Sequence, residues 1–551
     1  MPRRQRVRTL KRLCLSNVAV NMKDVWAKDY VDNYLTEYDF LYIMGPFNDL
    51  ASVLVEELLQ LLGETRRLSR AFLHLLLVPH LVELNLRSCS GLASNAIGQI
   101  IHARCRGLTA LNLHACSRIQ SSVLVDLVEC LPRLRKLTLS STQCDSQVLS
   151  AIGSSCRELR ELDVSRCKKV TSAGLLHLVY DQTRAAFNSL QLRNLLAEGL
   201  ELPLDTDTQH VAVMAFLLLA LPRLEHVTHT FLVEALTLIH GRLFGKGQHF
   251  LESRGFPSLE EVAGFGPTAG VGASQPQGLG LRRLDIVLGQ DLSIVTSICR
   301  EIAEVTVSLD HELRDLRHLH SWKQLTHLTV ECSEFHKRSL SDMIPVLSCL
   351  GPHLQLLSLQ NFHFHQETSL NHILPSCPNL RVFQSQLHLP PQSSNSSPAT
   401  EDSDDDDNGH QRDTNPLFRT NWRFPQLKDF SLRILDSSPL PRSFQLSIRV
   451  ALTSALHGSP QLSKLSLINI PVCLDKVFQN VLEQPGSLAQ LSELCLAHSR
   501  VSNAAVHLLM AADNQLVSLD LRHCRDVHRR HYDQFVEDAK RSKFDLEISW
   551  E

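Results

Sequence analysis

Aliphatic and polar positions follow a recurring pattern along this chain, Leu-x-x-Leu-x-Leu. Clear copies begin at Leu81, Leu108, Leu134 and Leu159, and their starts lie 27, 26 and 25 residues apart. The Leu-x-Leu part has the period of two expected of a half-buried strand, and the apolar spacing that follows it is typical of a short helix. The pattern therefore predicts repeating units of about 25 residues, each a strand followed by a helix.

Looser copies of the pattern continue almost to the end of the chain. They begin at Phe187, Leu281, Ile302, Leu325, Leu354, Leu427, Leu462, Leu491 and Leu516, and Leu380 begins a degenerate one. Residues 544–548 fit a closing edge strand. Because one strand–helix unit cannot bury its apolar side alone, neighbouring units must stack. The sequence predicts an α/β fold, a leucine-rich-repeat solenoid (horseshoe) that follows an N-terminal helical segment.

The cysteines follow the same register as the leucines. Cys89, Cys116, Cys167 and Cys524 each come eight residues after the first leucine of their repeat. A cysteine at such a turn is a small apolar residue that fills space under the loop. This arrangement resembles the cysteine-containing repeats of the F-box/leucine-rich-repeat proteins, and it predicts that most of the fifteen cysteines are packing residues.

Two interruptions divide the repeats into blocks. The first holds apolar helical runs and a Gly/Pro-rich stretch, and the second is rich in Pro, Ser, Asn and Asp with few apolar residues, which favours disorder. The predicted organisation is an N-terminal helical segment at 1–70, regular repeats at 71–196, an irregular helical and Gly/Pro-rich insertion at 197–280, repeats at 281–389, a disordered acidic insertion at 390–416, and C-terminal repeats with a cap at 417–551.

Charge and composition argue against several classes of protein. The 551 residues carry 55 basic and 58 acidic side chains, a formal charge of -3, and six of the acids lie in residues 401–407. Near-neutrality disfavours a general nucleic-acid or membrane-surface binder. No run of about 18 apolar residues predicts a membrane span, and no secretory signal is recognisable. We therefore expect a cytoplasmic or nuclear protein whose cysteines stay reduced.

Signatures of catalysis and metal binding are missing from the sequence. The glycines at 264–280 are not followed by Gly-Lys-Ser/Thr, so no phosphate loop is indicated. His311-Glu312 lacks the second histidine of a metalloprotease motif, and no Cys-x-x-Cys pair or Gly-x-Ser-x-Gly elbow occurs. We expect a protein that is not an enzyme, with no catalytic residues, no metal site and no cofactor.

The segment before the repeats carries a more specific motif. Leu10, Cys14 and Val18 are spaced four apart after Thr9, so on a helix they form one apolar stripe suited to a partner's groove. The motif resembles the BC box of elongin-binding ubiquitin-ligase receptors. The resemblance implies that Leu10 fills a pocket on elongin C, while Cys14 and Val18 complete the contact. An alternative is that Leu10-Leu13-Leu15 forms a repeat strand.

A second N-terminal segment, residues 49–62, also resembles adaptor-binding sequences. It is similar to the helix of cullin-2 boxes and to the opening of an F-box, although both families usually have Leu-Pro where this chain has Leu50-Ala51. The resemblance adds Leu50, Leu54 and Leu58 to the expected adaptor contacts. The layout as a whole resembles the zyg-11 family of cullin-2 receptors and the leucine-rich-repeat homologues of the yeast antagonist of mitotic exit. The alternative is an N-terminal cap without an adaptor.

Polar residues between the repeat leucines are expected to line the concave strand face and to contact a target protein. Their mixed signs suit a protein ligand better than nucleic acid. The candidates are Glu83, Asn85, Arg87, Asn112, His114, Lys136, Thr138, Glu161, Asp163 and Arg166. In the acidic insertion, Ser403 lies among acids in a context that acid-directed kinases favour, so it is a candidate modification site.

Together these features predict a non-catalytic substrate-recognition subunit of a cullin-RING ubiquitin ligase. Its N-terminal segment would dock on elongin C and elongin B with a cullin, or on Skp1, and its repeats would bind an unknown target protein. The alternative function is a leucine-rich-repeat scaffold or inhibitor with no link to ubiquitin ligases.

Overall fold

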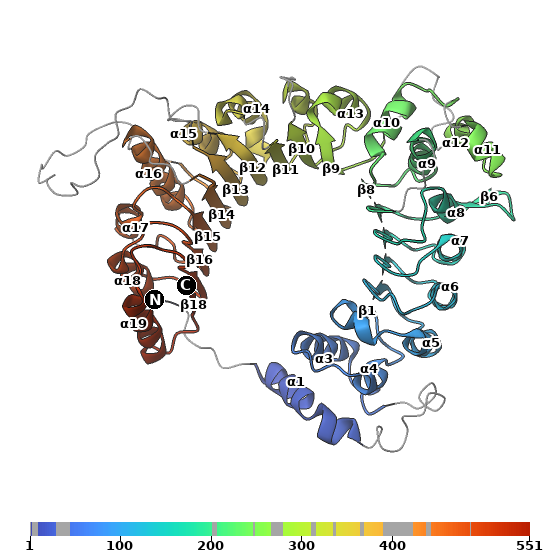
Figure 1. Cartoon of the computed structure of the whole chain (residues 1–551), viewed down its shortest axis with the longest axis horizontal. Coiled ribbons are helices and arrows are strands. Elements are labelled where there is room, and N and C mark those ends of the chain that lie inside the picture. Colours follow the sequence, from blue (N-terminus) through green and yellow to red (C-terminus); the bar gives the residue numbers. More distant parts are fainter. Residues whose placement is uncertain are drawn as a thin grey trace, which may run out of the picture. The chain divides into compact units, whose positions relative to one another are not determined.

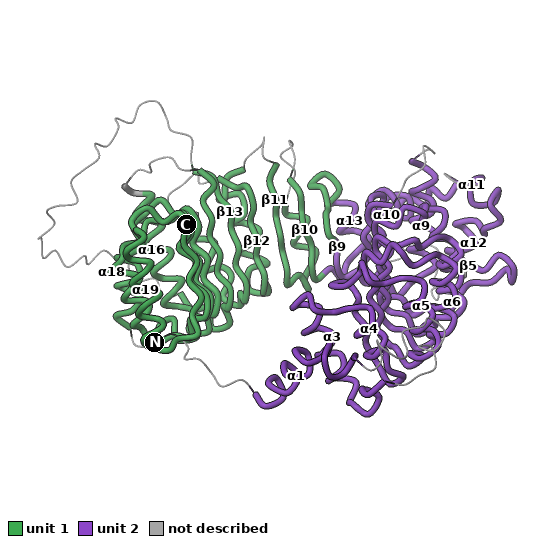
Figure 2. The backbone as a smooth tube through the Cα atoms, turned by 60° about the horizontal axis from the view of Figure 1, so that its bottom comes forward, with its two compact units in different colours: residues 1–7, 285–292, 303–551 green, residues 8–284, 293–302 purple. Residues whose placement is uncertain are grey.

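The structure is a computed structural model. It describes residue 2 and residues 9–28, 45–200, 207–245, 248–265, 279–309, 316–333, 338–363, 369–389, 422–436, 442–484 and 486–551. The chain divides into two compact units (Figure 2), unit 2 with residues 8–284 and 293–302, and unit 1 with residues 1–7, 285–292 and 303–551. The acidic insertion 390–416 with Ser403, and the His311-Glu312 pair, lie outside the described residues.

Unit 2 opens with helices and continues as a parallel sheet with helices on one side (Figure 1). The opening segment comprises α1 (Leu10–Val20), a π-helical turn (Met22–Trp26), α3 (Ser52–Glu64) and α4 (Arg70–Leu76). The strands, in sheet order, are β1 (Glu83–Asn85), β2 (Ala110–Asn112), β3 (Lys136–Thr138), β4 (Glu161–Asp163), β7 (Asn194–Leu196) and β8 (His226–Thr228). The outer helices are α5 (Asn95–Arg104), α6 (Ser121–Glu129), α7 (Ser146–Ser155), α8 (Leu176–Val179), α9 (Asp207–Ala220), α10 (Leu232–His240), α11 (Gln248–Ser253) and α12 (Leu259–Phe265).

Unit 1 has the same architecture, and its strands are longer, at five to eight residues, except for the last three, which have three residues each. The strands are β10 (Glu304–Leu309), β11 (His327–Cys332), β12 (Leu356–His363), β13 (Val382–His388), β14 (Asp429–Ile434), β15 (Lys464–Ile468), β16 (Glu493–Cys495), β17 (Ser518–Asp520) and β18 (Glu547–Ser549). Its helices are α14 (Ile344–Leu350), α15 (Ser369–Ile373), α16 (Arg442–His457), α17 (Asp475–Leu482), α18 (Asn503–Ala511) and α19 (Arg529–Arg541). At the boundary in sequence lie β9 (Arg283–Leu288) and α13 (Leu292–Ile298).

Leucines at equivalent positions face each other from strand to strand, and this pairing sets the register. Leu111 pairs with Leu84 and with Leu137, and Leu162 continues the row. Each of these side chains is at most 2% exposed. Parallel strands need a crossover, which each repeat supplies through its outer helix. The predicted α/β leucine-rich-repeat solenoid is confirmed.

A recurring pair of contacts turns the chain after β1, β2 and β4. In unit 2 the side-chain oxygens of Asn85, Asn112 and Asp163 accept the N–H two residues later, at 3.0, 2.9 and 3.0 Å. These Asx turns start the loop. The loop then passes through a left-handed residue, such as Ala115 (φ 60°) or Arg166 (φ 56°), whose N–H donates to a carbonyl of the next repeat. The loops of successive repeats are thereby joined by hydrogen bonds.

Buried cysteines add a further link between repeats. The thiols of Cys167 and Cys524 donate to the carbonyls of Leu139 and Leu496, 28 residues earlier in each case, at 3.0 and 3.1 Å. Cys116 is fully buried in the equivalent turn. The predicted packing role of these cysteines is confirmed, and the thiol also satisfies a carbonyl of the preceding repeat.

The predicted register of the fifth repeat is wrong. Its strand is β7, so Leu192, Leu195 and Ala197 occupy the leucine positions and are buried. Phe187 instead lies in a short antiparallel hairpin with Tyr180 and is 37% exposed. Leu192 fits the pattern both as the third position after Phe187 and Leu190 and as the first position before Leu195. The second register is the correct one, but its third position is alanine, which does not match the leucine pattern. The segment 197–280, predicted as an irregular insertion, also contains the repeat strand β8.

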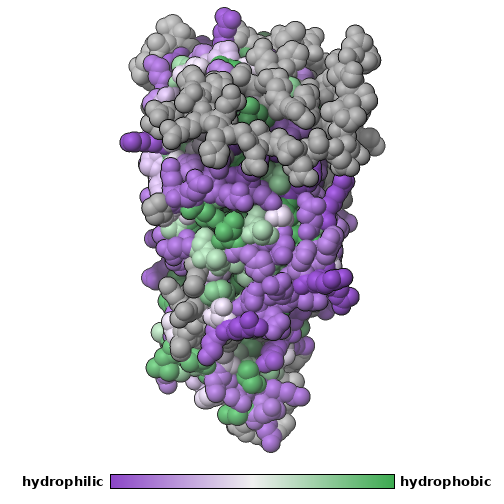
Figure 3. All heavy atoms as spheres, turned by 90° about the vertical axis from the view of Figure 1, so that its left-hand side faces the viewer, coloured by the Kyte–Doolittle hydropathy of each residue, from purple (hydrophilic) through white to green (hydrophobic). Residues whose placement is uncertain are grey.

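The outer surface of unit 1 is mixed in polarity. Figure 3 shows this face from the left-hand side of Figure 1, with hydrophilic side chains interrupted by small apolar areas. Leu446 and Leu508, from α16 and α18, are 48% and 42% exposed. A closing strand is present as predicted, but at Glu547–Ser549 instead of 544–548, and this β18 pairs in parallel with β17. Within the described part of the chain, every helix is too short or too polar to cross a membrane.

Candidate adaptor-binding and strand-face surfaces

The BC-box-like segment is helical and leaves part of its apolar stripe open to solvent. Thr9 caps α1, because its hydroxyl oxygen accepts the N–H of Arg12 at 3.3 Å. Leu10 is 77% exposed and Leu13 45% exposed, and Cys14 is exposed beside them. We call Leu10, Leu13 and Cys14 the α1 apolar face. The alternative interpretation of this segment as a repeat strand is wrong.

The other side of α1 packs against α3 (Figures 1 and 2). Ala19 is buried and Val18 half-buried, so Val18 belongs only in part to the open face. Lys11 forms an ion pair with Glu57 of α3. Both side chains of this pair are more than a third exposed, so the pair orients α1 more than it stabilises the fold.

The three leucines predicted in the second segment have different environments. Leu50 lies in the turn before α3 and is half-buried, as is Leu54 in the first turns of the helix. Leu58 is fully buried in the interior of unit 2. On the same helix, Val53 is 59% exposed although the sequence did not single it out. Leu58 therefore serves the core and lies outside the surface open to a partner.

Helix α3 also covers the edge of the first strand. The Ser52 hydroxyl accepts the N–H of Val82 at 3.4 Å, and Glu56 Oε1 accepts the N–H of Glu83 at 3.2 Å. An uncovered edge strand would leave these N–H groups to water or to another chain. Capping of the repeats, the alternative role of the N-terminal segment, is thus present in the structure, and it is compatible with an adaptor contact on α1.

The ten predicted strand-face residues are all exposed or half-buried, although Arg87, His114 and Arg166 come after the strands, and several of the ten already have partners. Asn85, Asn112 and Asp163 hold the Asx turns described above. Lys136 Nζ pairs with Glu161 Oε2 at 2.7 Å, and His114 Nδ1 lies 2.7 Å from Ser140 Oγ.

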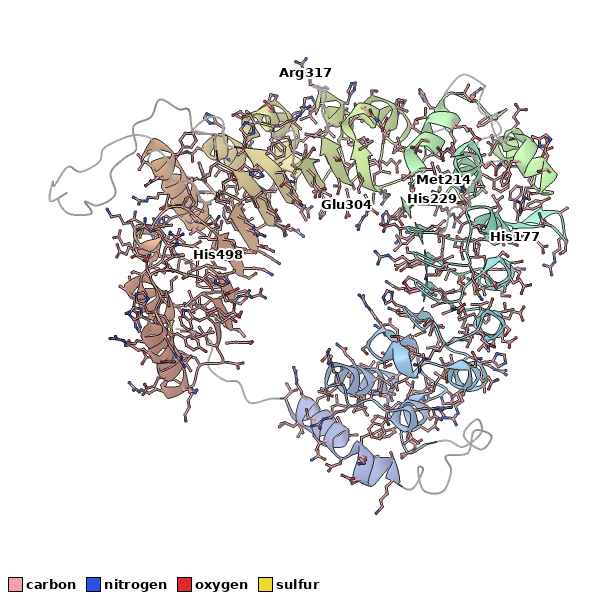
Figure 4. The ribbon with its side chains drawn as sticks, in the orientation of Figure 1. His177, Met214, His229, Glu304, Arg317 and His498 are labelled. Atoms are coloured by element: carbon pink, nitrogen blue, oxygen red, sulfur yellow. The ribbon has the colours of Figure 1, made fainter. Side chains whose placement is uncertain are left out.

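The remaining residues are more available for binding. Glu83, Arg87 and Arg166 are exposed, and Thr138 is half-buried. The same orientation holds in unit 1, where Figure 4 shows Glu304 on the strand side and Arg317 on the helix side. Of the repeats of unit 2, the first therefore offers the most exposed strand-face side chains for a ligand, Glu83 and Arg87.

A hollow of about 680 Å³ lies where α3 meets this first repeat. Its lining residues are, from α3, Val53, Glu56, Glu57, Leu59, Gln60 and Glu64, and, from the first repeat, Glu83, Asn85, Arg87 and Ser88. Sequence reasoning missed the α3 side of this hollow, because Glu56 and Glu83 are 27 residues apart and belong to different predicted segments.

No group of three potential ligands for a metal ion occurs among the described residues. Near the C-terminus, where the sequence brings Cys524, His528 and His531 close, the Cys524 thiol donates to the Leu496 carbonyl. The His528 N–H donates to His531 Nδ1 at 3.2 Å. These groups thus take part in packing and in capping α19.

The cysteines range from fully buried to exposed thiols, with Cys130, Cys473 and Cys495 between the two. Burial raises the pKa of Cys105, Cys116 and Cys156 to about 12 in each case. At pH 8, about one in ten thousand of such thiols is ionised, and the thiolate is the reactive form. Cys14 and Cys349 are exposed. We expect iodoacetamide to label Cys14 and Cys349 within minutes in the native protein and the three buried cysteines only after denaturation, as measured by mass spectrometry of peptides.

A contrary labelling result has a clear meaning. Rapid native labelling of Cys105 or Cys156 would contradict their packing between repeats. Slow labelling of Cys14 in the isolated chain, relative to Cys349, would contradict an open α1 apolar face.

No family model matches this chain. Over 103 residues it is 35% identical to F-box/LRR-repeat protein 4 of Bos taurus, a stretch that covers 18% of this chain and 16% of that protein. The chain therefore matches only about a sixth of this relative's length.

Solved structures similar to the chain include the following. The yeast Rad7 and Elc1 complex has a TM-score of 0.43 with 12% identity and covers 96% of each chain. A leucine-rich-repeat protein of Leptospira interrogans has a TM-score of 0.36 with 13% identity, over 86% of this chain and 95% of the other. An internalin of Listeria monocytogenes has a TM-score of 0.32 with 14% identity, over 77% and 82%. The register of strands and buried leucines makes the chain itself a leucine-rich-repeat protein.

Proposed function

We propose that this chain is a non-catalytic substrate-recognition subunit of a cullin-RING ubiquitin ligase that binds elongin C, and through it elongin B and a cullin. The observation that carries the proposal is the α1 apolar face. A helix that only capped the repeats would turn its apolar residues inward, yet Leu10 is 77% exposed. An amphipathic helix that presents residues four apart is suited to a hydrophobic groove on a partner.

The rest of the chain fits this role. The strand-face surface would hold the target, and the ligase would act by proximity, since tethering raises the target's effective concentration near the ubiquitin-loaded enzyme. The partial match to a protein named F-box/LRR-repeat protein 4 supports a ligase role and keeps Skp1 as the alternative adaptor. The proposal places the protein in the cytosol or the nucleus, where its thiols stay reduced.

The test is adaptor capture by a double variant of the α1 apolar face. Purified tagged chain is incubated with elongin B/C or with Skp1, and bound adaptor is quantified. We expect the wild-type chain to retain elongin B/C, and Leu10→Ala/Cys14→Ala to weaken retention about thirtyfold, because truncation of a central anchor costs about 2 kcal/mol or more.

The matched control is Leu243→Ala/Cys349→Ala, which truncates the same two residue types at other exposed positions. It should retain elongin B/C as the wild-type chain does. Retention of Skp1 alone, unaffected by the α1 variant, would favour the F-box alternative. Retention of neither adaptor would contradict the ligase role and leave a leucine-rich-repeat scaffold or inhibitor as the function.

A further inference from the structure

Four of the ten described residues that line the hollow between α3 and the first repeat are carboxylates, and they are most of its charged groups. Glu56, Glu57 and Glu64 come from α3 and Glu83 from β1, whereas Arg87 is the one cation among its described lining residues. Four carboxylates against one guanidinium give the hollow a negative potential, which is stronger in a concave site than on an open surface.

The carboxylates of α3 are positioned before any ligand binds. Glu56 Oε1 accepts the Ser52 hydroxyl at 2.7 Å and the Glu83 N–H at 3.2 Å. Glu64 Oε1 accepts the side-chain amide of Gln60 at 2.8 Å. The two contacts of Glu56 restrain its side chain, so less conformational entropy remains to be lost when a cation pairs with it, whereas the Glu64 contact is exposed.

One of these carboxylates already pairs with an ammonium group of the chain itself. Lys11 of α1 forms an ion pair with Glu57, one of the lining residues. The ammonium group belongs to α1, which precedes the repeats. It pairs with α3 as the cationic side chain of a ligand would. It neutralises one carboxylate and leaves Glu56, Glu64 and Glu83 for a ligand.

Size and lining suit a long basic side chain with adjoining backbone. A hollow of about 680 Å³ lies within the range of small-ligand sites, about 300 to 1,000 Å³. Val53 and Leu59 supply apolar lining beside the carboxylates. Lysine and arginine combine an aliphatic stem with a cationic head, so both parts find a matching environment.

We propose that this hollow binds a lysine- or arginine-bearing segment of the target protein, and that it anchors the target at the N-terminal end of the strand-face surface. The proposal deepens the proposed function, on which it rests for the identity of the ligand as a target. The occupant is a basic peptide because three carboxylates of α3 and the carboxylate of Glu83 on β1 line the same hollow, where they can pair with a cationic side chain.

The test measures binding of a defined peptide by fluorescence anisotropy. The probe is a short fluorescein-labelled peptide with two arginines in a glycine–alanine background, and the matched peptide carries citrulline, the neutral analogue, at both positions. The full-length purified chain is used without adaptor. We expect saturable binding of the arginine peptide, and binding of the citrulline peptide weaker by tenfold or more at the same ionic strength.

Two substitutions test the location of the site, and a third serves as the control. Glu83→Gln and Glu64→Gln keep the side-chain shape and remove the charge, so each should weaken arginine-peptide binding about tenfold. Glu64 bonds only to its own helix neighbour among the contacts above, so its variant separates binding from folding. Glu129→Gln, at the exposed end of α6, is the matched control and should leave the affinity unchanged.

The proposal is overturned if both peptides bind equally, if neither binds, or if Glu129→Gln weakens binding as much as Glu83→Gln. It is also overturned if a chain lacking residues 3–8 binds the peptide tenfold tighter, because the chain's own N-terminal arginines would then be the occupant. Leu10→Ala/Cys14→Ala should bind the peptide normally. Adaptor capture thus tests the proposed function and peptide anisotropy tests the hollow, so one proposal can fail without the other.

Discussion

Replacing Leu162 with alanine should lower the free energy of local unfolding around β4 by about 3 kcal/mol. Leu162 is 1% exposed and lies at the centre of β4, paired with Leu137 on one side and Leu195 on the other. Both neighbours are fixed by their own strands, so the cavity left by the substitution cannot close. The variant therefore loses both the free energy of burying the removed methyl groups and the packing contacts around the cavity.

Hydrogen exchange followed by mass spectrometry measures this effect repeat by repeat. Because repeats contact mainly their neighbours, loss of protection should be largest in β3, β4 and β7 and should decrease toward β1. Val82→Ala is the control, since Val82 is 44% exposed and its truncation should change protection by less than about 0.5 kcal/mol. Equal loss of protection throughout unit 2 would contradict a repeat-by-repeat assembly.

Most repeats with aliphatic residues at all three positions could be predicted from sequence, although Ile286, the third position of the repeat that begins at Leu281, is 64% exposed. Leu108, Leu111 and Leu113, for example, fit the repeat pattern in only one register, and all three are buried in the structure as that register predicts. The strand β8 was missed because its third position is His229, in Leu224-x-x-Val227-x-His229. Burial lowers the pKa of His229 to about 4, so this imidazole stays neutral at physiological pH and tolerates a position where leucine is usual.

The candidate site could be predicted only in part, since a motif gives spacing along one helix but not which side faces the protein. The spacing of Leu10 and Cys14 correctly placed them on one helix face, and both are exposed. The same four-residue spacing in α3 gave Leu54 and Leu58, yet Leu58 is fully buried. Helix α3 packs on the first strand, whereas α1 packs on α3, and this order of layers is a tertiary property.

The hollow was beyond sequence reasoning for a related reason. Its carboxylates come from a helix and from a strand, and they meet only because α3 caps the edge of β1. The hydrogen bond from the Glu83 N–H to Glu56 Oε1 creates that meeting. The same contact therefore caps the edge of β1 and assembles the proposed binding hollow.

Gly153→Ala, in the middle of unit 2, should destabilise the protein by about 2 kcal/mol, although alanine is the better helix former by about 1 kcal/mol. A Cβ at this position of α7 would lie 2.3 Å from the Leu178 carbonyl oxygen and 2.5 Å from Asn188 Nδ2. That amide donates to the same Leu178 oxygen at 3.0 Å, so the methyl group would meet a carbonyl that is already held in place. Backbone must shift to admit it.

Urea unfolding followed by circular dichroism, with exchange at residues 176–188, distinguishes the two effects by sign. Gly91→Ala is the control, because a Cβ there would meet nothing within 4 Å. It should leave stability unchanged within about 0.5 kcal/mol. If Gly153→Ala were neutral or stabilising, helix propensity would outweigh the clash, and the close approach of α7 to the Leu178 carbonyl would be wrong. Loss of exchange protection centred on Leu178 and Asn188 would instead identify glycine as the residue that lets these two repeats pack at this distance.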